Sequence, residues 1–118
     1  MATSIIKKNI GTVSTNSTST YEKSPDGTLI QWGRASATTN SSTGNGYFPY
    51  GGDVTITFPV PFVGDLPILL ATPLETAGYW NGGTSGTSPT LTQATVGIGG
   101  DTNNATKTVC WMAIGRWK

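Results

Sequence analysis

The side chains that could perform acid–base chemistry in this chain are few and lie far apart in the sequence. Histidine is absent, which excludes His-based triads, His metal ligands and His general bases. The remaining candidates are six carboxylates, Glu22, Asp26, Asp53, Asp65, Glu75 and Asp101. A glycosidase needs two carboxylates facing each other across a cleft, whereas each of the four aspartates adjoins a glycine, where Asp ordinarily caps a turn. We therefore predict no catalytic residue, and the chain is not expected to be an enzyme.

Metal and cofactor motifs are similarly weak. Residues 99–104, GGDTNN, have the small polar residues of a calcium loop, but they include one carboxylate and no later glutamate follows. Residues 97–100, GIGG, do not make a dinucleotide fingerprint without a strand–helix–strand setting. We predict a hairpin connection at 99–104, with no metal site and no cofactor.

Binding is the chemistry that the residue types favour. Two long segments, Thr38–Gly52 and Thr76–Pro89, each carry an aromatic cluster beside short polar residues. Saccharides present apolar C–H faces and hydroxyl edges, so aromatic planes next to small polar groups suit them, and rigid aromatic side chains lose little entropy on binding. The alternative is that a cluster packs against a neighbouring subunit. The candidate ligand-binding residues are Tyr47, Phe48, Tyr50, Tyr79, Trp80 and Asn81.

Composition limits the partners of the chain. Charged residues make up 11% of the 118 residues and the net charge is +1, so the clustered Lys and Arg of a nucleic-acid binder are missing. No apolar stretch approaches the length of a membrane span, and the N-terminus has no apolar signal-peptide region. We expect no nucleic acid and no membrane insertion, and synthesis in a cytoplasm. The single cysteine, Cys110, excludes an intrachain disulfide and is expected to be a buried, inert thiol.

The elements that must position these residues are short strands. Alternation places Ile30 and Trp32 on one face of 28–35, and we expect that face to be the core, with ligand stacking by Trp32 as the alternative. Residues 53–58 alternate cleanly, and the two prolines in 58–62 predict an extended corner with Phe58 and Phe62 buried. Turn signals rich in Gly, Pro, Asn and Asp separate five or six such strands, which predicts an all-β sandwich or open barrel. The domain is expected over 21–118, and residues 1–20 form an extension or edge strand.

Two strands are apolar on both faces. They are Leu66–Thr72 and Val109–Ile114, and a strand of this kind lies centrally or at a subunit contact. One face can fill the core while the other meets another copy of the chain, so the pattern favours a homo-oligomer.

Four segments carry a family resemblance, in order along 21–116. They are PDGTLIQWG at 25–33, VTITFPVPF at 54–62, LPILLATP at 66–73 and CWMAIGR at 110–116. Together they resemble the C-terminal tip domain of bacteriophage tail fibres. Arg116 departs from the pattern, because an aromatic residue is common at that place, and the chain continues through Trp117 and Lys118.

The resemblance implies a compact antiparallel β-sandwich of about six short strands that assembles as a homotrimer, similar to the trimeric H-type lectins. It implies a non-enzymatic adhesin at the distal end of a tail fibre or baseplate in the virion, made in the host cytoplasm. Its partners would be the rest of the fibre and a saccharide or protein receptor on the bacterial surface. The alternative is a purely structural cap that trimerises the fibre and binds no receptor.

Overall fold

A computed structural model of the chain describes residues 12–15, 19–40, 50–74, 79–84 and 89–118. These residues form eight strands and no helix, so the all-β class is confirmed and the strands outnumber the six or so expected. For β1 and β6 only the backbone is described. The strands are β1 (Thr12–Thr15), β2 (Ser19–Lys23), β3 (Thr28–Thr38), β4 (Tyr50–Thr57), β5 (Ile68–Pro73), β6 (Tyr79–Thr84), β7 (Gln93–Gly100) and β8 (Thr106–Arg116).

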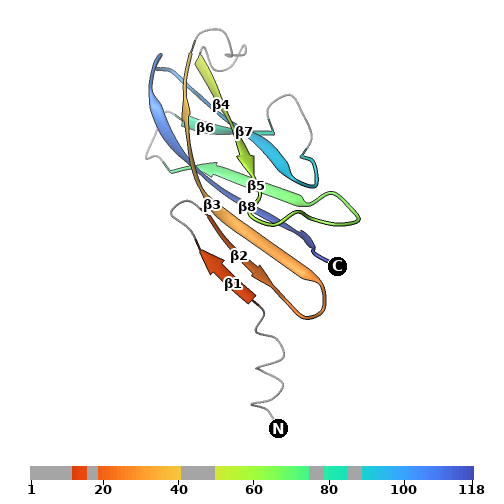
Figure 1. The fold of residues 1–118 in the computed structure, drawn as a ribbon. Coiled ribbons are helices and arrows are strands. Elements are labelled where there is room, and N and C mark those ends of the chain that lie inside the picture. The colour runs from red at the N-terminus through yellow and green to blue at the C-terminus, as the bar shows by residue number, and fades with distance from the viewer. Residues whose placement is uncertain (1–11, 16–18, 41–49, 75–78, 85–88) are drawn as a thin grey trace.

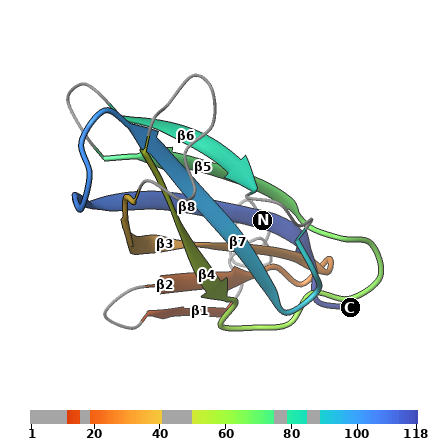
Figure 2. The same ribbon diagram turned by 90° about the horizontal axis from the view of Figure 1, so that it is seen from above.

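The strands make two antiparallel sheets that stack as the layers of a sandwich (Figures 1 and 2). The larger sheet has the order β1-β2-β3-β8-β5, and the smaller has the order β4-β7-β6. The β3–β8 ladder runs without interruption from Thr28 opposite Arg116 to Thr38 opposite Thr106. This long pair forms the centre of the larger sheet. Of the two strands that are apolar on both faces, β8 is therefore central, whereas β5 lies at the edge of the sheet.

The β2–β3 turn follows its sequence signal. Pro25 and Gly27 stand where a type I turn prefers them, and the Gly27 amide donates to the Ser24 carbonyl over 3.0 Å. Gly27 has a φ of 100°, a conformation that favours glycine. Asp26 Oδ1 accepts a hydrogen bond of 2.9 Å from the Thr28 amide, which caps the turn where β3 begins.

The core lies between the two sheets. Its buried apolar side chains come from both layers and from the connection after β4, and they are Leu29, Ala37, Ile56, Phe58, Phe62, Ala94, Val96, Ile98, Val109, Trp111 and Ala113. The predicted alternation of 53–58 is confirmed by the burial of Ile56 and Phe58, and Val96 and Ile98 of β7 are buried at alternate positions as well.

The predicted face of β3 is wrong. Leu29 and Gln31 are fully buried, whereas Ile30 and Trp32 are half-exposed on the outer face of the larger sheet. Gln31 is compatible with the core because its amide is fully paired. Its Nε2 donates to the Val60 carbonyl over 2.7 Å, and its Oε1 accepts from the Val60 amide over 2.9 Å.

The corner at residues 58–62 has the predicted form. Phe58 and Phe62 are buried with an edge-to-face contact, their ring centroids 5.0 Å apart and their planes at 86°. The glutamine on β3 replaces the strand partner that the two prolines exclude at Val60. This corner closes one end of the sandwich.

Threonine hydroxyls supply much of the polarity of the exterior. Thr38 and Thr106 hydrogen-bond across the β3–β8 ladder at 2.8 Å, and Thr55 and Thr95 do so across β4 and β7 at 3.1 Å. Such cross-strand pairs stabilise a sheet without charge. No helix among the described residues is long and apolar enough to cross a membrane.

Candidate functional site

One end of the sandwich brings two of the predicted aromatic positions into one row. Tyr50 of β4 and Tyr79 of β6 both pair with Gly100 of β7. Directly opposed residues of antiparallel strands share a face, and two strand intervals separate the tyrosine backbones by about 9.5 Å. The glycine between them contributes no side chain. Along β4 and β7 this row shares the phase of the core residues Ile56, Val96 and Ile98, so Tyr50 lies on the core side of the smaller sheet at its end, where it is half-buried.

The other predicted residues do not join this row. Trp80 pairs with Gly99 and Asn81 with Ile98, so the Trp80 position belongs to the opposite face of the sheet from that of Tyr79. Tyr47 and Phe48 lie outside the described residues. The six candidates therefore do not converge on a single face of the smaller sheet.

The connection between β7 and β8 lies at this end and is hydrogen-bonded to Thr39. The Thr39 side chain is fully buried; its hydroxyl donates to the Thr102 carbonyl over 2.6 Å and accepts from the Ala105 amide over 3.0 Å. The Thr39 carbonyl accepts from the Asn104 amide over 2.9 Å. Asn104 has a φ of 54°, which asparagine tolerates better than most residues. Residues 101–105 are thus pinned to Thr39. The predicted hairpin connection is wrong, because β7 pairs with β4 and β6 in the smaller sheet while β8 pairs with β3 and β5 in the larger one, so this segment crosses between the sheets.

The opposite end of the sandwich contains the β2–β3 turn and the point where the chain enters the fold. Thr12, the first residue of β1, pairs with Lys23 just before that turn. The C-terminal residues lie there as well, because Arg116 donates to the Asp26 carbonyl over 2.6 Å and Trp117 Nε1 donates to the Ser24 carbonyl over 2.9 Å. The incoming chain and the Tyr50–Tyr79 row are therefore at opposite ends of the sandwich (Figure 1).

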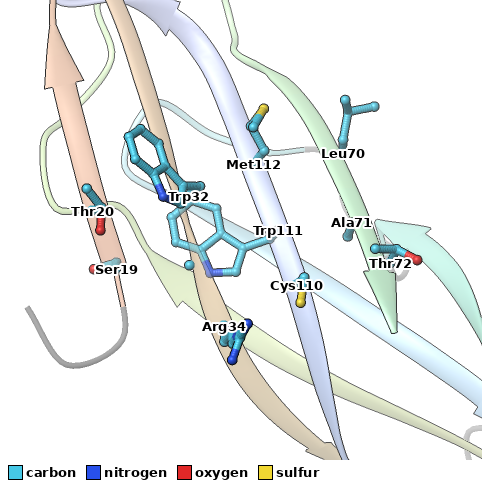
Figure 3. A pocket seen from close by; sticks show the side chains of 11 residues that line it. Ser19, Thr20, Trp32, Arg34, Leu70, Ala71, Thr72, Cys110, Trp111 and Met112 are labelled. Atoms are coloured by element: carbon cyan, nitrogen blue, oxygen red, sulfur yellow. The ribbon is translucent and has the colours of Figure 1, made fainter. Parts of the chain in front are cut away.

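The outer face of the larger sheet has a hollow of about 710 Å³. Figure 3 shows Trp32 and Thr20 on one side of it and Leu70 and Met112 on the other. The register explains the grouping, because Thr20, Trp32, Met112 and Leu70 form one row across β2, β3, β8 and β5.

Cys110 also lines this hollow. The prediction of a buried thiol is wrong, since Cys110 is half-exposed on the outer face. Sequence reasoning missed the hollow because it assigned Trp32 to the core. Two residues could have indicated the correct face. Arg34 and Ser36 lie on the same face of β3 as Trp32 and are exposed, and charged and polar residues of this kind usually face solvent.

The described carboxylates do not form a site. Asp53, Asp65 and Asp101 are exposed on different segments, and no cluster of three metal-ligating side chains exists among the described residues. Asp26, which caps the β2–β3 turn, is a carboxyl with a shifted pKa. Its pKa is lowered by the hydrogen bond from the Thr28 amide, and then by the charges of Arg116 and Lys118.

Several solved structures share the fold of this chain. The N-truncated R2-type pyocin tail fibre superposes with a TM-score of 0.60 at 24% identity, over 98% of this chain and 41% of that one. The N-truncated R1-type pyocin tail fibre gives 0.64 at 19% identity, over 97% and 93%. A C-terminal fragment of the P. aeruginosa R1 pyocin fibre gives 0.63 at 20% identity, over 88% and 27%. The chain thus spans less than half of two of these three structures.

The family follows from the sequence itself. Residues 23–116 match the family described as "Putative tail fiber protein gp53-like, C-terminal", and the chain belongs to that family of tail fibre C-terminal domains. No curated protein sequence matches the chain.

Proposed function

We propose that this domain is the non-enzymatic, receptor-binding tip of a tail fibre, at the distal end of the fibre or baseplate in the virion. The observation that carries the proposal is the placement of the two ends. The chain enters at Thr12, beside the β2–β3 turn, and the row of Tyr50 and Tyr79 lies at the other end of the sandwich. A domain attached through its entry point presents the Tyr50–Tyr79 end to a cell surface.

The chemistry of that end suits a bacterial surface saccharide or protein. Two tyrosine positions flank a glycine in one row, and the connection between β7 and β8 beside them is pinned by hydrogen bonds through Thr39. Aromatic planes on a rigid frame bind with a small loss of conformational entropy. Tyr47, Phe48, Trp80 and Asn81 remain proposed ligand contacts.

We propose further that the tip is a homotrimer joined to the rest of its fibre. Large apolar side chains on the outer face of the larger sheet support an oligomer, since Ile68 is 65% exposed and Leu70 59% exposed. Monomeric proteins rarely expose contiguous patches of this kind. Sedimentation at micromolar concentration should give three times the chain mass; the mass of one chain would contradict the trimer.

Binding is tested with labelled protein on a panel of intact bacterial strains and on polysaccharide extracted from the strains that bind. Tyr79→Ala and Trp80→Ala should each reduce binding at least tenfold while the circular dichroism spectrum is retained. Val63→Ala, an exposed change at the opposite end, is the matched control and should bind like the parent chain.

The structural cap is the competing function. A variant distinguishes the two functions. In it, segments 41–49 and 75–78 are replaced by Gly/Ser sequences of equal length. No binding to any strain by the parent chain would favour the cap, whereas binding by the parent chain that the replaced chain loses would favour the receptor-binding tip.

A further inference from the structure

The hollow on the outer face of the larger sheet has a size and a lining that suit a small ligand. Its volume of about 710 Å³ is typical of small-molecule sites in proteins. Trp32 and Met112 belong to the apolar part of its lining, and Thr20 and Thr72 add hydroxyl groups. Ligand sites commonly combine an apolar majority with a few polar groups that fix the orientation of the ligand.

Trp32 offers an aromatic surface to this hollow. The residue is half-exposed, and Thr20 of β2 lies directly opposite it in the sheet (Figure 3). The apolar C–H face of a sugar ring can stack on an indole, and a neighbouring hydroxyl can pair with the hydroxyl groups at the edge of the ring. The Trp32 side of the hollow therefore has the two features that a saccharide requires.

Arg34 is the charged residue in the lining. It follows Trp32 by two positions on the same face of β3, so the two backbones are about 6.6 Å apart, and Cys110 of β8 lies directly opposite Arg34. Within the part of the chain that the structure describes, the guanidinium has no hydrogen-bond or ion-pair partner. A guanidinium binds a carboxylate or phosphate through two parallel hydrogen bonds, so the hollow favours an anion.

From this juxtaposition of an indole and an unpaired guanidinium we infer that the hollow binds a sugar ring that carries an anionic group. The ring stacks on Trp32, its carboxylate or phosphate accepts hydrogen bonds from Arg34, and a ring hydroxyl pairs with Thr20. A purely apolar ligand would take the guanidinium out of water without a partner, which is costly. The inference rests on the proposed function for the choice of a saccharide, and it adds a second site, with a charge requirement, on a different surface from the Tyr50–Tyr79 row.

The two sides of the hollow can serve different partners. Trp32 and Thr20 lie on one side, and Leu70 and Met112 lie on the other (Figure 3). The exposed residues that support the proposed trimer, Ile68 and Leu70, belong to β5, whereas the ligand contacts inferred here belong to β2 and β3. A subunit contact along β5 is therefore compatible with a ligand on the indole and the guanidinium.

Calorimetric titration tests the charge requirement. The probes are methyl glucuronide and glucose 6-phosphate, with methyl glucoside as the neutral reference. The parent chain should bind an anionic sugar roughly tenfold more tightly than the neutral one, because hydrogen bonds to charged groups are the stronger ones. Binding of one anionic sugar and not the other identifies the group as a carboxylate or a phosphate and supports the inference; equal binding of all three sugars, or of none, would overturn it.

Variants assign the preference to its residues. Arg34→Gln should remove the preference for anionic sugars, and Trp32→Ala should weaken the binding of all three. Lys118→Gln removes an exposed cation at the end with the β2–β3 turn and is the matched control, which should keep the preference. All three variants should retain the circular dichroism spectrum of the parent chain. A folded Arg34→Gln variant that still prefers anionic sugars would overturn the inference.

The single cysteine reports where the sugar binds. Cys110 lines the hollow and is half-exposed, and the chain has no other thiol. Iodoacetamide should add one label, measured by mass spectrometry, and saturating methyl glucuronide should slow the labelling severalfold, whereas the same concentration of methyl glucoside should not. A labelling rate that the anionic sugar leaves unchanged, or a thiol that does not react in the parent chain, would overturn the inference.

Cell binding separates this inference from the proposed function. A parent chain that binds cells but none of the three sugars overturns the inference and leaves the receptor-binding tip standing. A chain that binds the anionic sugar and protects Cys110, but binds no cell, leaves the inference standing and overturns the proposed function.

Discussion

Gln31 shows how a single residue organises one end of the molecule. It is fully buried in a sandwich core, where polar side chains are rare, and its amide makes both hydrogen bonds that a neighbouring strand would make to Val60. Because Val60 lies between two prolines, its amide is the local donor that needs a partner. The glutamine therefore lets a proline-rich corner pack against the sheet without an unpaired backbone group.

Replacing this amide should be costly. Gln31→Leu keeps the size of the side chain but leaves the Val60 amide and carbonyl unpaired, so we expect a loss of about 2–4 kcal/mol in the free energy of unfolding. Urea denaturation measures it. Gln93→Leu, an exposed change in β7, should alter stability by about 0.5 kcal/mol or less; equal effects of the two variants would contradict the role of Gln31.

Asp26 should make stability depend on pH. Its pKa is lowered below the ordinary 3.8 by the Thr28 amide and by the charges of Arg116 and Lys118. A lowered pKa in the folded state means that the carboxylate stabilises the fold above its unfolded pKa, and that this contribution is lost as pH falls through the lowered value. The stability difference between the parent chain and Asp26→Asn should therefore shrink on acidification below 3.8. A difference independent of pH would contradict this account.

The C-terminal residues act together as an element that holds the β2–β3 turn. Arg116 donates to the Asp26 carbonyl, the Trp117 amide donates to the Gly27 carbonyl and its indole to Ser24. Lys23 and Lys118 lie 5.1 and 5.0 Å from the centroid of the Trp117 ring, within the range of a cation–π contact. Arg116 thus makes a backbone contact at the turn, and an aromatic ring follows it at Trp117.

Gly27 in this turn and Gly64 in the connection between β4 and β5 allow the cost of backbone strain to be separated from the cost of crowding. Gly27 and Gly64 both have positive φ, 100° and 75°, but a Cβ at Gly64 would meet open space, whereas one at Gly27 would collide with the Arg116 guanidinium. Gly64→Ala should cost about 1 kcal/mol from its conformation. Gly27→Ala should cost at least about 1 kcal/mol more, because Arg116 must leave Asp26.

The comparison is made by urea denaturation. The excess cost of Gly27→Ala should be smaller in an Arg116→Ala background, since coupled residues are not additive. An excess that persists without Arg116 would show that the crowding has another source.

At the scale of elements, the sequence predicts the β-sandwich and the turns between its strands better than it predicts which face of each strand is buried. Val54–Phe58 and Ala94–Ile98 alternate between apolar and small polar residues, so their inward faces follow directly. In β3 each of the two faces has a large apolar residue, so the pattern does not show which face is buried. Gln31, whose amide is hydrogen-bonded to Val60, is on the buried face. Its partner, Val60, is 29 positions away, and no local pattern contains that contact. The aromatic positions at Tyr50 and Tyr79 were predictable as residue types, but their row depends on the register of three strands.

The whole molecule has two distinct ends and one exposed apolar side. The chain enters at the end with the β2–β3 turn and C-terminal residues, and the tyrosine row lies at the other end (Figure 1). Ile68 and Leu70 of β5 are exposed on the outer face of the larger sheet. Under the proposed function, attachment and recognition would use opposite ends of the domain and subunit contact its side.

Thermal unfolding should report the subunit contact. If folding is coupled to association, the midpoint temperature rises with protein concentration, because mass action favours the assembled state. The parent chain should show this dependence in calorimetric scans over a hundredfold dilution series, and Leu70→Asp should remove it. A midpoint that is constant in the parent chain would contradict coupled assembly.

The position of β1 has a mechanical consequence. A fibre held at its base and bound to a cell would pull on Thr12 in one direction and on the tyrosine end in the other, so the load would run parallel to the strands. The four residue pairs that join β1 to β2 would then bear the tension together in shear, instead of separating one after another as in a peeled hairpin. Tension transmitted along the strands would thus be shared by a whole ladder before any part of the domain gives way.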